Sequence, residues 1–511
     1  MLPAPSLVLP AAHLKPYTSL PGPVSWPFIG AALPLLTSRR PSDVLAAWTA
    51  KYGPTVRVAL PGGKRAVLVT SPALIAEAAA LPAVPMPAGG ALTGASAPLP
   101  TAAHAALAAC LGSPDSADAA GAFGATMAAC ASLVRCLVAA GPNAPVDLAD
   151  GLDRLALDAA VKGGFGLEAG GLKEGGGSVA KEGFGSCELL SDLRAGVAGL
   201  GPLAGLGCPK AGAAAASAPL QSHWKSMAAV LKGRGPPAPA DKSVGAALAR
   251  AGLADADLAA AIGSVVTAAT LPISRAAAWA LFDLCSEPAV QDKVARELGE
   301  AGLLAHGEDR APRVVTASDA ASRLPYLGAV VRESLRVHGV GVPGAGLAGC
   351  VRAVTSPEGA SLGGVFLPPG TLVAAPPACV HGSAPNFANP SRFSPDRWLE
   401  PVKPHTPKAV TEKPGPVLLV GKPKAHGGAP GAFVPFGSGP AACPAQGAAL
   451  LQVTALVASL VSSFRMRLDD SMGGRKGVAA ASEEDGAGAR LGAGLKMVFV
   501  PRASIGFSAD V

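Results

Sequence analysis

The sequence predicts a mainly α protein with a small β region. The first observation is an apolar run over 255–284 with only four charged residues, which is typical of a helix buried on nearly all sides. The second is a set of further helix patterns, over 287–300, 324–338 and 447–464. The third is that strand patterns are short and few: 56–60, 64–69, 363–373 and 497–501.

The N-terminal part opens with a Pro-stiffened extended segment over 20–30. Residues 17–38 are uncharged and moderately apolar, but prolines interrupt them, so a membrane-spanning helix is disfavoured. A helix is expected over 42–52, where it is followed by Gly and Pro. The Pro61-Gly62-Gly63 turn after it predicts a β-hairpin.

The middle of the chain is expected to alternate helices with long connections. Gly-rich or Pro-rich stretches at 163–186, 200–219 and 232–241 predict these connections. Helical patterns continue on both sides, so the stretches mark no domain boundary. In the apolar run beyond them, Pro272 is expected to kink the helix or to remove one of its backbone hydrogen bonds.

Composition excludes several classes of protein. The 511 residues include 64 glycines and 50 prolines, but no Gly-X-Y period, so collagen is excluded. Half of the residues are apolar and 15% are charged, which allows a buried core and disfavours disorder. The net charge of +7 comes with only 4% aromatic residues, which are too few to stack repeatedly on single-stranded nucleic acid, so no nucleic-acid partner is expected. Nine cysteines lie far apart, without zinc spacing.

Two motifs place arginines where they can bind a carboxylate. In Glu333-Ser334-Leu335-Arg336 the acid and the base lie three residues apart, on one helical face. On its own this pattern also fits an ordinary surface ion pair. In Phe393-Ser394-Pro395-Asp396-Arg397-Trp398, Pro and aromatic residues restrict the backbone around Arg397. A planar guanidinium there can bridge a carboxylate and backbone carbonyls, although a solvated loop is the simpler interpretation.

A third motif places a cysteine at the start of a helix. The run from Phe436 to Pro444 contains Gly437, Gly439 and Cys443, and an apolar helix follows from 447. Glycines allow backbone N–H groups to approach a sulfur atom, and a helix N-terminus favours thiolate over thiol. This arrangement suits an iron ligand, and the alternative is a buried cysteine at a helix start.

These three motifs, in this order, resemble those of the cytochrome P-450 family. Similarity extends over roughly 265–465, and more weakly over 20–80. The resemblance implies the cytochrome P-450 fold in one large domain over 20–505, after a leader or flexible N-terminus over 1–19. It also implies heme b as cofactor.

The resemblance assigns roles to single residues. Cys443 would be the thiolate ligand of the heme iron, and Phe436, Gly437 and Gly439 would shape its loop. The structural network of the family would consist of Glu333, Arg336 and Arg397. Arg352 and His104 are the residues expected to meet the heme carboxylates, and Thr270 is the expected catalytic residue.

Several positions depart from the family pattern. Ala441 stands where the family usually has Arg or His, and Ala445 where it usually has Gly. On the distal side, Leu271 and Pro272 replace the acid and the threonine that normally relay protons. Thr270, Thr267 or a water molecule would then have to take over that relay.

The resemblance implies an O2-dependent heme-thiolate monooxygenase that hydroxylates an apolar small molecule with electrons from a redox partner. The altered distal pair leaves open a heme-thiolate isomerase or dehydratase that acts on a hydroperoxide without O2. The missing heme-carboxylate contacts leave open a heme-poor, non-catalytic relative.

The expected electron donor is a reductase or a ferredoxin-type protein. Five lysines and one acidic residue within 401–430 would suit an acidic donor, or would form a solvated loop. Peripheral membrane contact is also expected. The protein is expected to be intracellular, either membrane-associated or organellar, and the sequence assigns no compartment.

Overall fold

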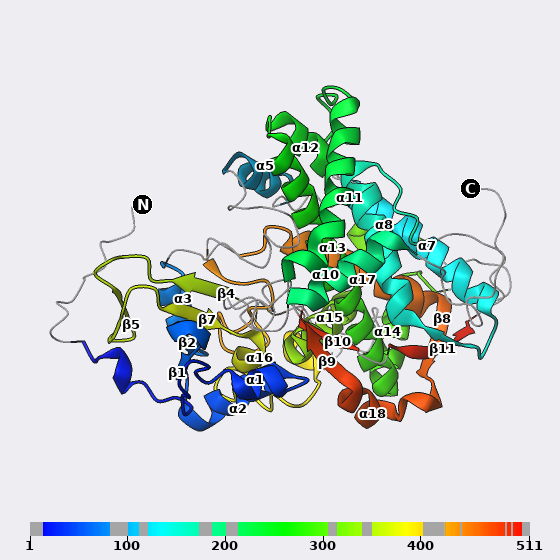
Figure 1. Cartoon of the computed structure of the whole chain (residues 1–511). Coiled ribbons are helices and arrows are strands. Elements are labelled where there is room, and N and C mark those ends of the chain that lie inside the picture. The colour runs from blue at the N-terminus through cyan, green and yellow to red at the C-terminus, as the bar shows by residue number, and fades with distance from the viewer. Residues whose placement is uncertain are drawn as a thin grey trace, which may run out of the picture.

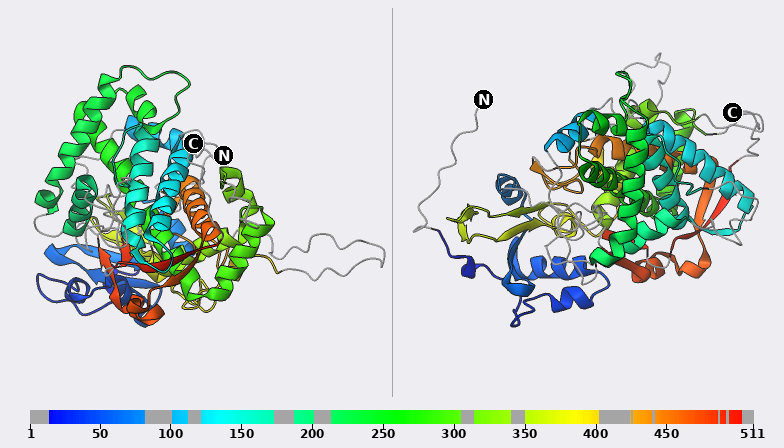
Figure 2. Two further views of the ribbon diagram at one scale, coloured as in Figure 1. Left: turned by 90° about the vertical axis from the view of Figure 1, so that its right-hand side faces the viewer. Right: turned by 45° about the horizontal axis from the view of Figure 1, so that its top comes forward.

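The computed structural model describes residues 14–81, 101–111, 121–172, 187–200, 213–304, 314–339, 350–401, 424, 426–439, 442–485, 488–491 and 494–502. A large helical body forms one side of the molecule and a smaller β region the other (Figure 1). The two further views in Figure 2 show the same division. The prediction of a mainly α protein with a small β region is confirmed.

The helical body is built around α13 (Asp255–Ser286), the longest described helix. Its middle is almost free of charge, so it can be buried on most sides. The helices packed against it are α8 (Leu148–Phe165), α11 (Ala213–Gly233), α15 (Pro325–His338) and α17 (Gln446–Ser463). Further out, α7 (Ala122–Ala140) covers α8, and α10 (Glu188–Leu200) covers α11. By length and composition α7, α13 and α17 could each cross a membrane, but here they pack against other helices.

The β region contains a four-stranded sheet in the order β1 (Thr55–Ala59), β2 (Arg65–Val69), β7 (Leu372–Ala375), β4 (Cys350–Ala353). β1 and β2 form the predicted hairpin, and β2 pairs in parallel with β7. This pairing brings residues more than 300 positions apart into one sheet. The helices α2 (Pro41–Tyr52) and α16 (Pro377–His381) contact each other beside it. The ribbon β5 (Ala360–Leu362) and β6 (Val365–Leu367) extends from the same region.

A second sheet joins the middle of the chain to its C-terminal part. β11 (Lys496–Pro501) lies between β3 (Pro145–Asp147) and β8 (Phe464–Leu468), antiparallel to both. A short ribbon of β9 (Ser482–Asp485) and β10 (Gly488–Leu491) lies nearby in sequence. The remaining helices are α1 (Leu33–Thr37), α3 (Pro72–Ala78), α5 (Thr101–Leu111), α12 (Val244–Arg250), α14 (Pro288–Glu300) and α18 (Gly474–Ala481).

The described part of the chain also contains short helical turns. They are η2 (Tyr17–Ser19), η3 (Pro61–Gly63), η5 (Asp319–Arg323), η7 (Pro395–Trp398) and η9 (Asp470–Met472). The turn η7 holds the second motif of the sequence beside α15.

The structure corrects the expected course of one segment and shows how another accommodates a proline. α11 begins at Ala213, so the connection expected through residue 219 was wrong there, and Pro219 lies inside the helix. Although Pro is a poor helix residue, buried apolar neighbours such as Leu220 and Trp224 stabilise this stretch. α13 also runs unbroken through Pro272, whose nitrogen has no hydrogen to donate, so of the two expected effects the loss of one backbone hydrogen bond applies. The domain limits of 20–505 stay a prediction.

Candidate functional site

The cysteine motif forms a tight loop that leads directly into α17. The backbone N–H of Cys443 donates to the carbonyl oxygen of Phe436 over 2.8 Å, which closes the loop. Gly437 and Gly439 have φ of 81° and 66°, a region that residues with a Cβ rarely adopt. A Cβ at Gly439 would also lie 2.7 Å from the Cβ of Ala79, so the loop needs glycine there. α17 then begins at Gln446.

The charge state of Cys443 depends on more than its place at a helix start. Burial raises the pKa of its thiol, and the hydrogen bond from the backbone of Ala445 lowers it by less. A bound metal ion would supply the missing positive charge, because a coordinating thiol loses its proton.

Arg352 reaches the cysteine loop from the β region. Its guanidinium is buried, and Nη2 donates to the carbonyl oxygen of Ser438 over 2.7 Å. Nη1 donates to its own neighbour, Val351, over 3.1 Å. Arg352 and Ser438 line one small cavity together with Ala79. The structure thus brings Arg352 together with the cysteine loop, where the sequence resemblance expected a cation.

An accessible apolar stripe interrupts the burial of α13. Ala268 is exposed in the middle of this helix. Residues on the same face, one turn before it, beside it and one turn after it, are only half-buried: Ser264, Val265, Ala269, Pro272 and Ile273. The first turns of α17 are likewise half-buried at Ala448, Ala449 and Leu450. Ile273, Phe436 and Leu450 all border the main hydrophobic core. Apolar side chains left accessible at the centre of a fold fit a flat apolar cofactor, and Arg352 fits its carboxylates.

Glu333 is the buried centre of a network of hydrogen bonds. Arg336 Nε and Nη2 donate to its two carboxylate oxygens over 2.9 Å each, and Arg397 Nε donates over 3.0 Å. The structure therefore brings the three predicted residues together. Burial raises the pKa of Glu333, but the hydrogen bonds and positive charges of Arg336 and Arg397 lower it more, so the net direction is down. This carboxylate stays ionised.

Sequence reasoning missed two further donors to that carboxylate. Trp398 Nε1 donates to Oε2 and the backbone N–H of Ser394 to Oε1, both over 2.9 Å. Arg336 Nη1 also donates to the carbonyl oxygen of Pro390 over 2.8 Å. Trp398 is the last residue of the second motif, and this position was the sequence signal that could have identified it as a donor to Glu333.

The distal residues have a different geometry. Thr270 is fully buried, and its Oγ1 donates to the carbonyl oxygen of Val266 over 2.7 Å, within α13. The Oγ1 of Thr267 is buried without a hydrogen-bond partner among the described residues. His104 lies in α5, but its side chain and all of Ala441 lie outside the described residues. Their roles, like that of Thr270, stay predictions.

Comparisons with known proteins agree with this geometry. Residues 240–476 match the family model "Cytochrome P450". The chain is 31% identical to cytochrome P450 monooxygenase sphH of Aspergillus fumigatus, over 37% of this chain and 30% of the relative. It is 31% identical to cytochrome P450 76M5 of Oryza sativa subsp. japonica, over 38% and 32%. These matches thus span about a third of each relative.

The fold is similar to the crystal structure of the cytochrome P450DA heme domain, with a TM-score of 0.70 and 17% identity over 96% of this chain and 98% of that one. The part of the chain over 240–476 thus matches the cytochrome P450 family, and the fold is that of a P450 heme domain. Both likenesses, together with the cysteine loop before α17, support a cysteine-ligated heme as cofactor.

Proposed function

We propose that the protein is an O2-dependent heme-thiolate monooxygenase that acts on an apolar small molecule. The observation that carries the proposal is the cysteine loop at the start of α17, in a fold whose central helix α13 leaves an apolar face accessible. The relative from Aspergillus fumigatus, which carries the name of a monooxygenase, supports the same activity.

In this proposal each group of residues has its own task. Cys443 binds the iron and gives up its thiol proton, while Gly437 and Gly439 let the loop turn tightly around it. The buried cation of Arg352 pairs with a heme carboxylate. When bound, the heme supplies the activation of O2 and the transfer of an oxygen atom.

The accessible face of α13 selects what can approach. Ala268, Ala269 and Ile273 offer only apolar surface, which favours an apolar substrate. The buried hydroxyl of Thr267 makes no hydrogen bond to any described residue, so it is available to bind a water molecule that relays protons.

A peroxide isomerase or dehydratase is the second candidate. The observation that favours it is that Thr270 donates its hydroxyl to Val266 within the helix, while Leu271 and Pro272 beside it carry no exchangeable side-chain proton. Such an enzyme needs neither O2 nor an external electron donor. Turnover of a fatty-acid hydroperoxide without reductant would support this candidate, and strict dependence on NAD(P)H with a reductase would exclude it.

The decisive experiment is the absorption spectrum of the reduced, CO-bound protein after expression with heme precursor. We expect near-stoichiometric heme and a thiolate-type Soret band, which Cys443→Ala removes. Cys379→Ala is the matched control, because Cys379 is buried in α16, outside the cysteine loop. The absence of a thiolate-type band in the wild-type protein would overturn the proposal, and a heme content far below one per chain would favour a heme-poor relative.

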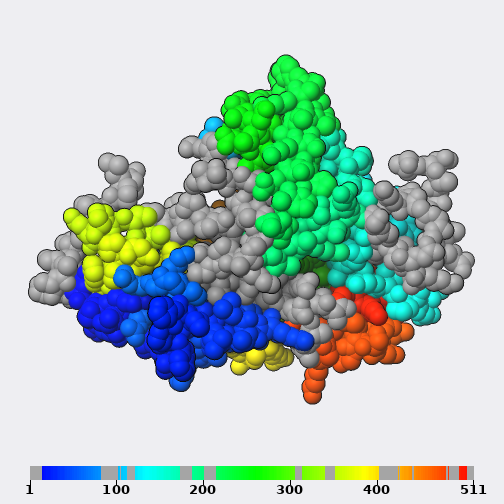
Figure 3. Space-filling view, viewed as in Figure 1, coloured from blue at the N-terminus to red at the C-terminus, as the bar shows by residue number. Residues whose placement is uncertain are grey.

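We further propose peripheral contact with a membrane through the N-terminal region. Trp26 is 63% and Phe28 94% exposed, and Val24, Ile29, Leu33 and Leu36 are exposed beside them. The segment belongs to the dark-blue surface along the lower edge of the molecule (Figure 3). A cluster of exposed aromatic and aliphatic side chains is suited to a lipid interface.

Vesicle co-sedimentation tests this contact. Binding to phosphatidylcholine vesicles should fall in a Trp26→Ser/Phe28→Ser variant. Val314→Ser should leave it unchanged, since Val314 is 68% exposed but lies elsewhere in the chain. Equal binding by all three proteins would exclude the N-terminal contact.

The electron donor is proposed to be a reductase or a ferredoxin-type protein. Most of the Lys-rich segment expected to meet it lies outside the described residues. Substrate turnover measured with each donor in turn distinguishes the two.

A further inference from the structure

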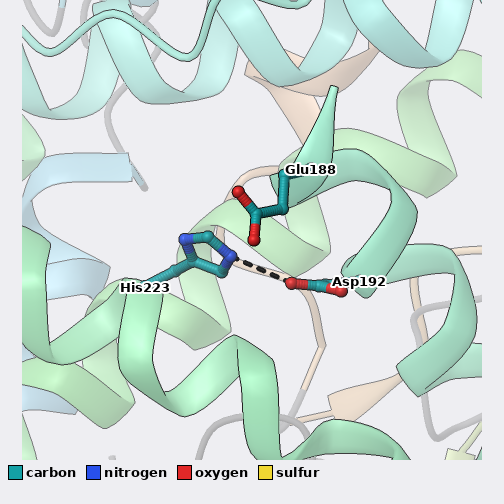
Figure 4. A group of neighbouring side chains, drawn as sticks. All are labelled: Glu188, Asp192 and His223. Atoms are coloured by element: carbon teal, nitrogen blue, oxygen red, sulfur yellow. Dashed lines mark hydrogen bonds and ion pairs between the residues drawn. The ribbon is translucent and has the colours of Figure 1, made fainter. Parts of the chain in front are cut away.

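Three potential metal ligands meet between α10 and α11. Glu188 and Asp192 lie four residues apart, so they share one face of α10, and His223 faces them from α11 (Figure 4). One ligand atom from each residue lies within 4.8 Å of the other two. His223 Nε2 and Asp192 Oδ2 are 3.0 Å apart. Sequence spacing gave no sign of this cluster, because the histidine lies 31 residues beyond Asp192.

A pocket gives this cluster access from solvent. It has a volume of about 450 Å³, and both Glu188 and His223 line it, together with Cys187, Ser226 and Met227. Asp192 does not line the pocket. The side chains of His223 and Asp192 are 30% and 23% exposed. Glu188 is exposed, so the cluster is open to solvent on its side.

The cluster differs from a simple ion pair. An Asp–His pair alone would be satisfied by the 3.0 Å contact between Asp192 and His223. Glu188 adds a second carboxylate to the same point, and it has no hydrogen bond or ion pair among the described residues. Two carboxylates this close together repel each other, and a cation bound between them would remove that repulsion. The imidazole of His223 carries at most one positive charge, so it cannot neutralise both carboxylates.

We propose that Glu188, Asp192 and His223 bind a divalent transition-metal ion, with Zn2+ as the best match. Carboxylate oxygens with one imidazole nitrogen are ligands that Zn2+ accepts, whereas Ca2+ and Mg2+ prefer oxygen alone. Three protein ligands would leave a fourth position for water. The ion would join α10 to α11 and so stabilise the folded state by mass action. This proposal is independent of the proposed monooxygenase activity.

Isothermal titration calorimetry tests the site on the heme-loaded protein, after chelation and dialysis. We expect one Zn2+ site in the wild-type protein that Asp192→Asn and His223→Gln each weaken by at least about tenfold, because each removes one of three ligands. Asn at 192 keeps the size of the side chain and can still bond to His223, so a folding defect is not the expected cause.

The matched control is Glu168→Gln. Glu168 lines the same pocket, but it pairs with Lys162 and is not one of the three ligands. Zn2+ should bind this variant as it binds the wild-type protein, and should raise the melting temperature of both but not that of His223→Gln. Unchanged Zn2+ affinity in Asp192→Asn and His223→Gln would overturn the proposal, and so would an equal loss of affinity in Glu168→Gln.

Discussion

The indole Nε1 of Trp398 donates a hydrogen bond of 2.9 Å to the buried carboxylate of Glu333. With Arg336, Arg397 and Ser394, it completes a set of donors that surrounds both oxygens. The carboxylate is 0% exposed, so no water replaces a lost donor. The network fixes α15 against η7, the turn that contains the end of the second motif.

Glu333→Gln should lower the free energy of unfolding by about 3–5 kcal/mol, because two buried guanidinium groups lose their counter-charge. Urea denaturation measures the change. Asp396→Asn is the matched control, since Asp396 lies in the same turn but its ion pair with Lys293 is largely exposed, and it should cost less than about 1 kcal/mol. Equal losses in the two variants would contradict the role assigned to the network.

Gly263→Ala should destabilise the contact between α13 and α11. A Cβ at this position would lie 2.7 Å from Nε1 of the fully buried Trp224, which has little room to move. Overpacking of this kind costs about 1–3 kcal/mol. Thermal unfolding measures it against Gly164→Ala in α8, where a Cβ meets nothing within 4 Å and should add about 0.5–1 kcal/mol. A Gly263→Ala protein as stable as the wild type would show that the two helices separate easily.

The raised pKa of Glu297 leads us to expect that the folded state becomes less stable as the pH rises. Burial raises the pKa of its carboxyl from 4.5 to about 7, although Tyr326 and Leu327 donate backbone hydrogen bonds to it. The folded state therefore binds the proton more tightly than the unfolded chain. Its contribution is complete below pH 4.5 and is lost as the pH rises through 7, by about 3 kcal/mol in all. Urea midpoints measured across this range should fall in the wild type, and the fall should be smaller in Glu297→Gln.

For His381 we expect the opposite dependence: the folded state loses stability as the pH falls. Its Nδ1 donates to the carbonyl oxygen of Arg336, and its Nε2 accepts from the backbone of Val434, which fixes the neutral tautomer. Burial, and secondarily the charge of Arg336, lowers its pKa from 6.5 to about 3. The stability that this neutral histidine provides is present above pH 6.5 and is lost as the pH falls towards 3.

The variant His381→Phe isolates this effect. It removes the titrating group, so the part of the acid-induced loss that His381 causes should disappear from urea midpoints measured between pH 6.5 and 4. Since Glu297 acts with the opposite sign over part of this range, the Glu297→Gln background gives the cleaner measurement. A slope unchanged by His381→Phe would mean that another group causes the acid sensitivity.

The sequence predicted the parts of the site that lie within single motifs. Cys443, with Gly437 and Gly439, could be identified because the backbone constraint and the ligand occupy one short run. The charged trio around Glu333 could be grouped only through family resemblance, because its members lie in two segments about 60 residues apart. The bond from Trp398 and the cluster of Glu188, Asp192 and His223 depend on tertiary contacts that no local pattern records.

Secondary structure followed the same division. The central helix over 255–284 was clear from its apolar run, and α13 extends it by only two residues. The first turns of α11 were missed, because Ala-rich sequence beside Pro219 resembles a connection until buried partners such as Trp224 are known. Local propensity is a weak guide where tertiary packing decides the outcome.

The position of β11 between β3 and β8 has a consequence for biosynthesis. Residues 145–147 acquire their strand partner only after residues 496–501 have left the ribosome, so the nascent chain carries an unpaired strand edge through most of translation. Domains with such distant pairings fold slowly, because the chain must close a long loop first. The sheet of β3, β11 and β8 therefore forms only once the chain has been made as far as residue 501.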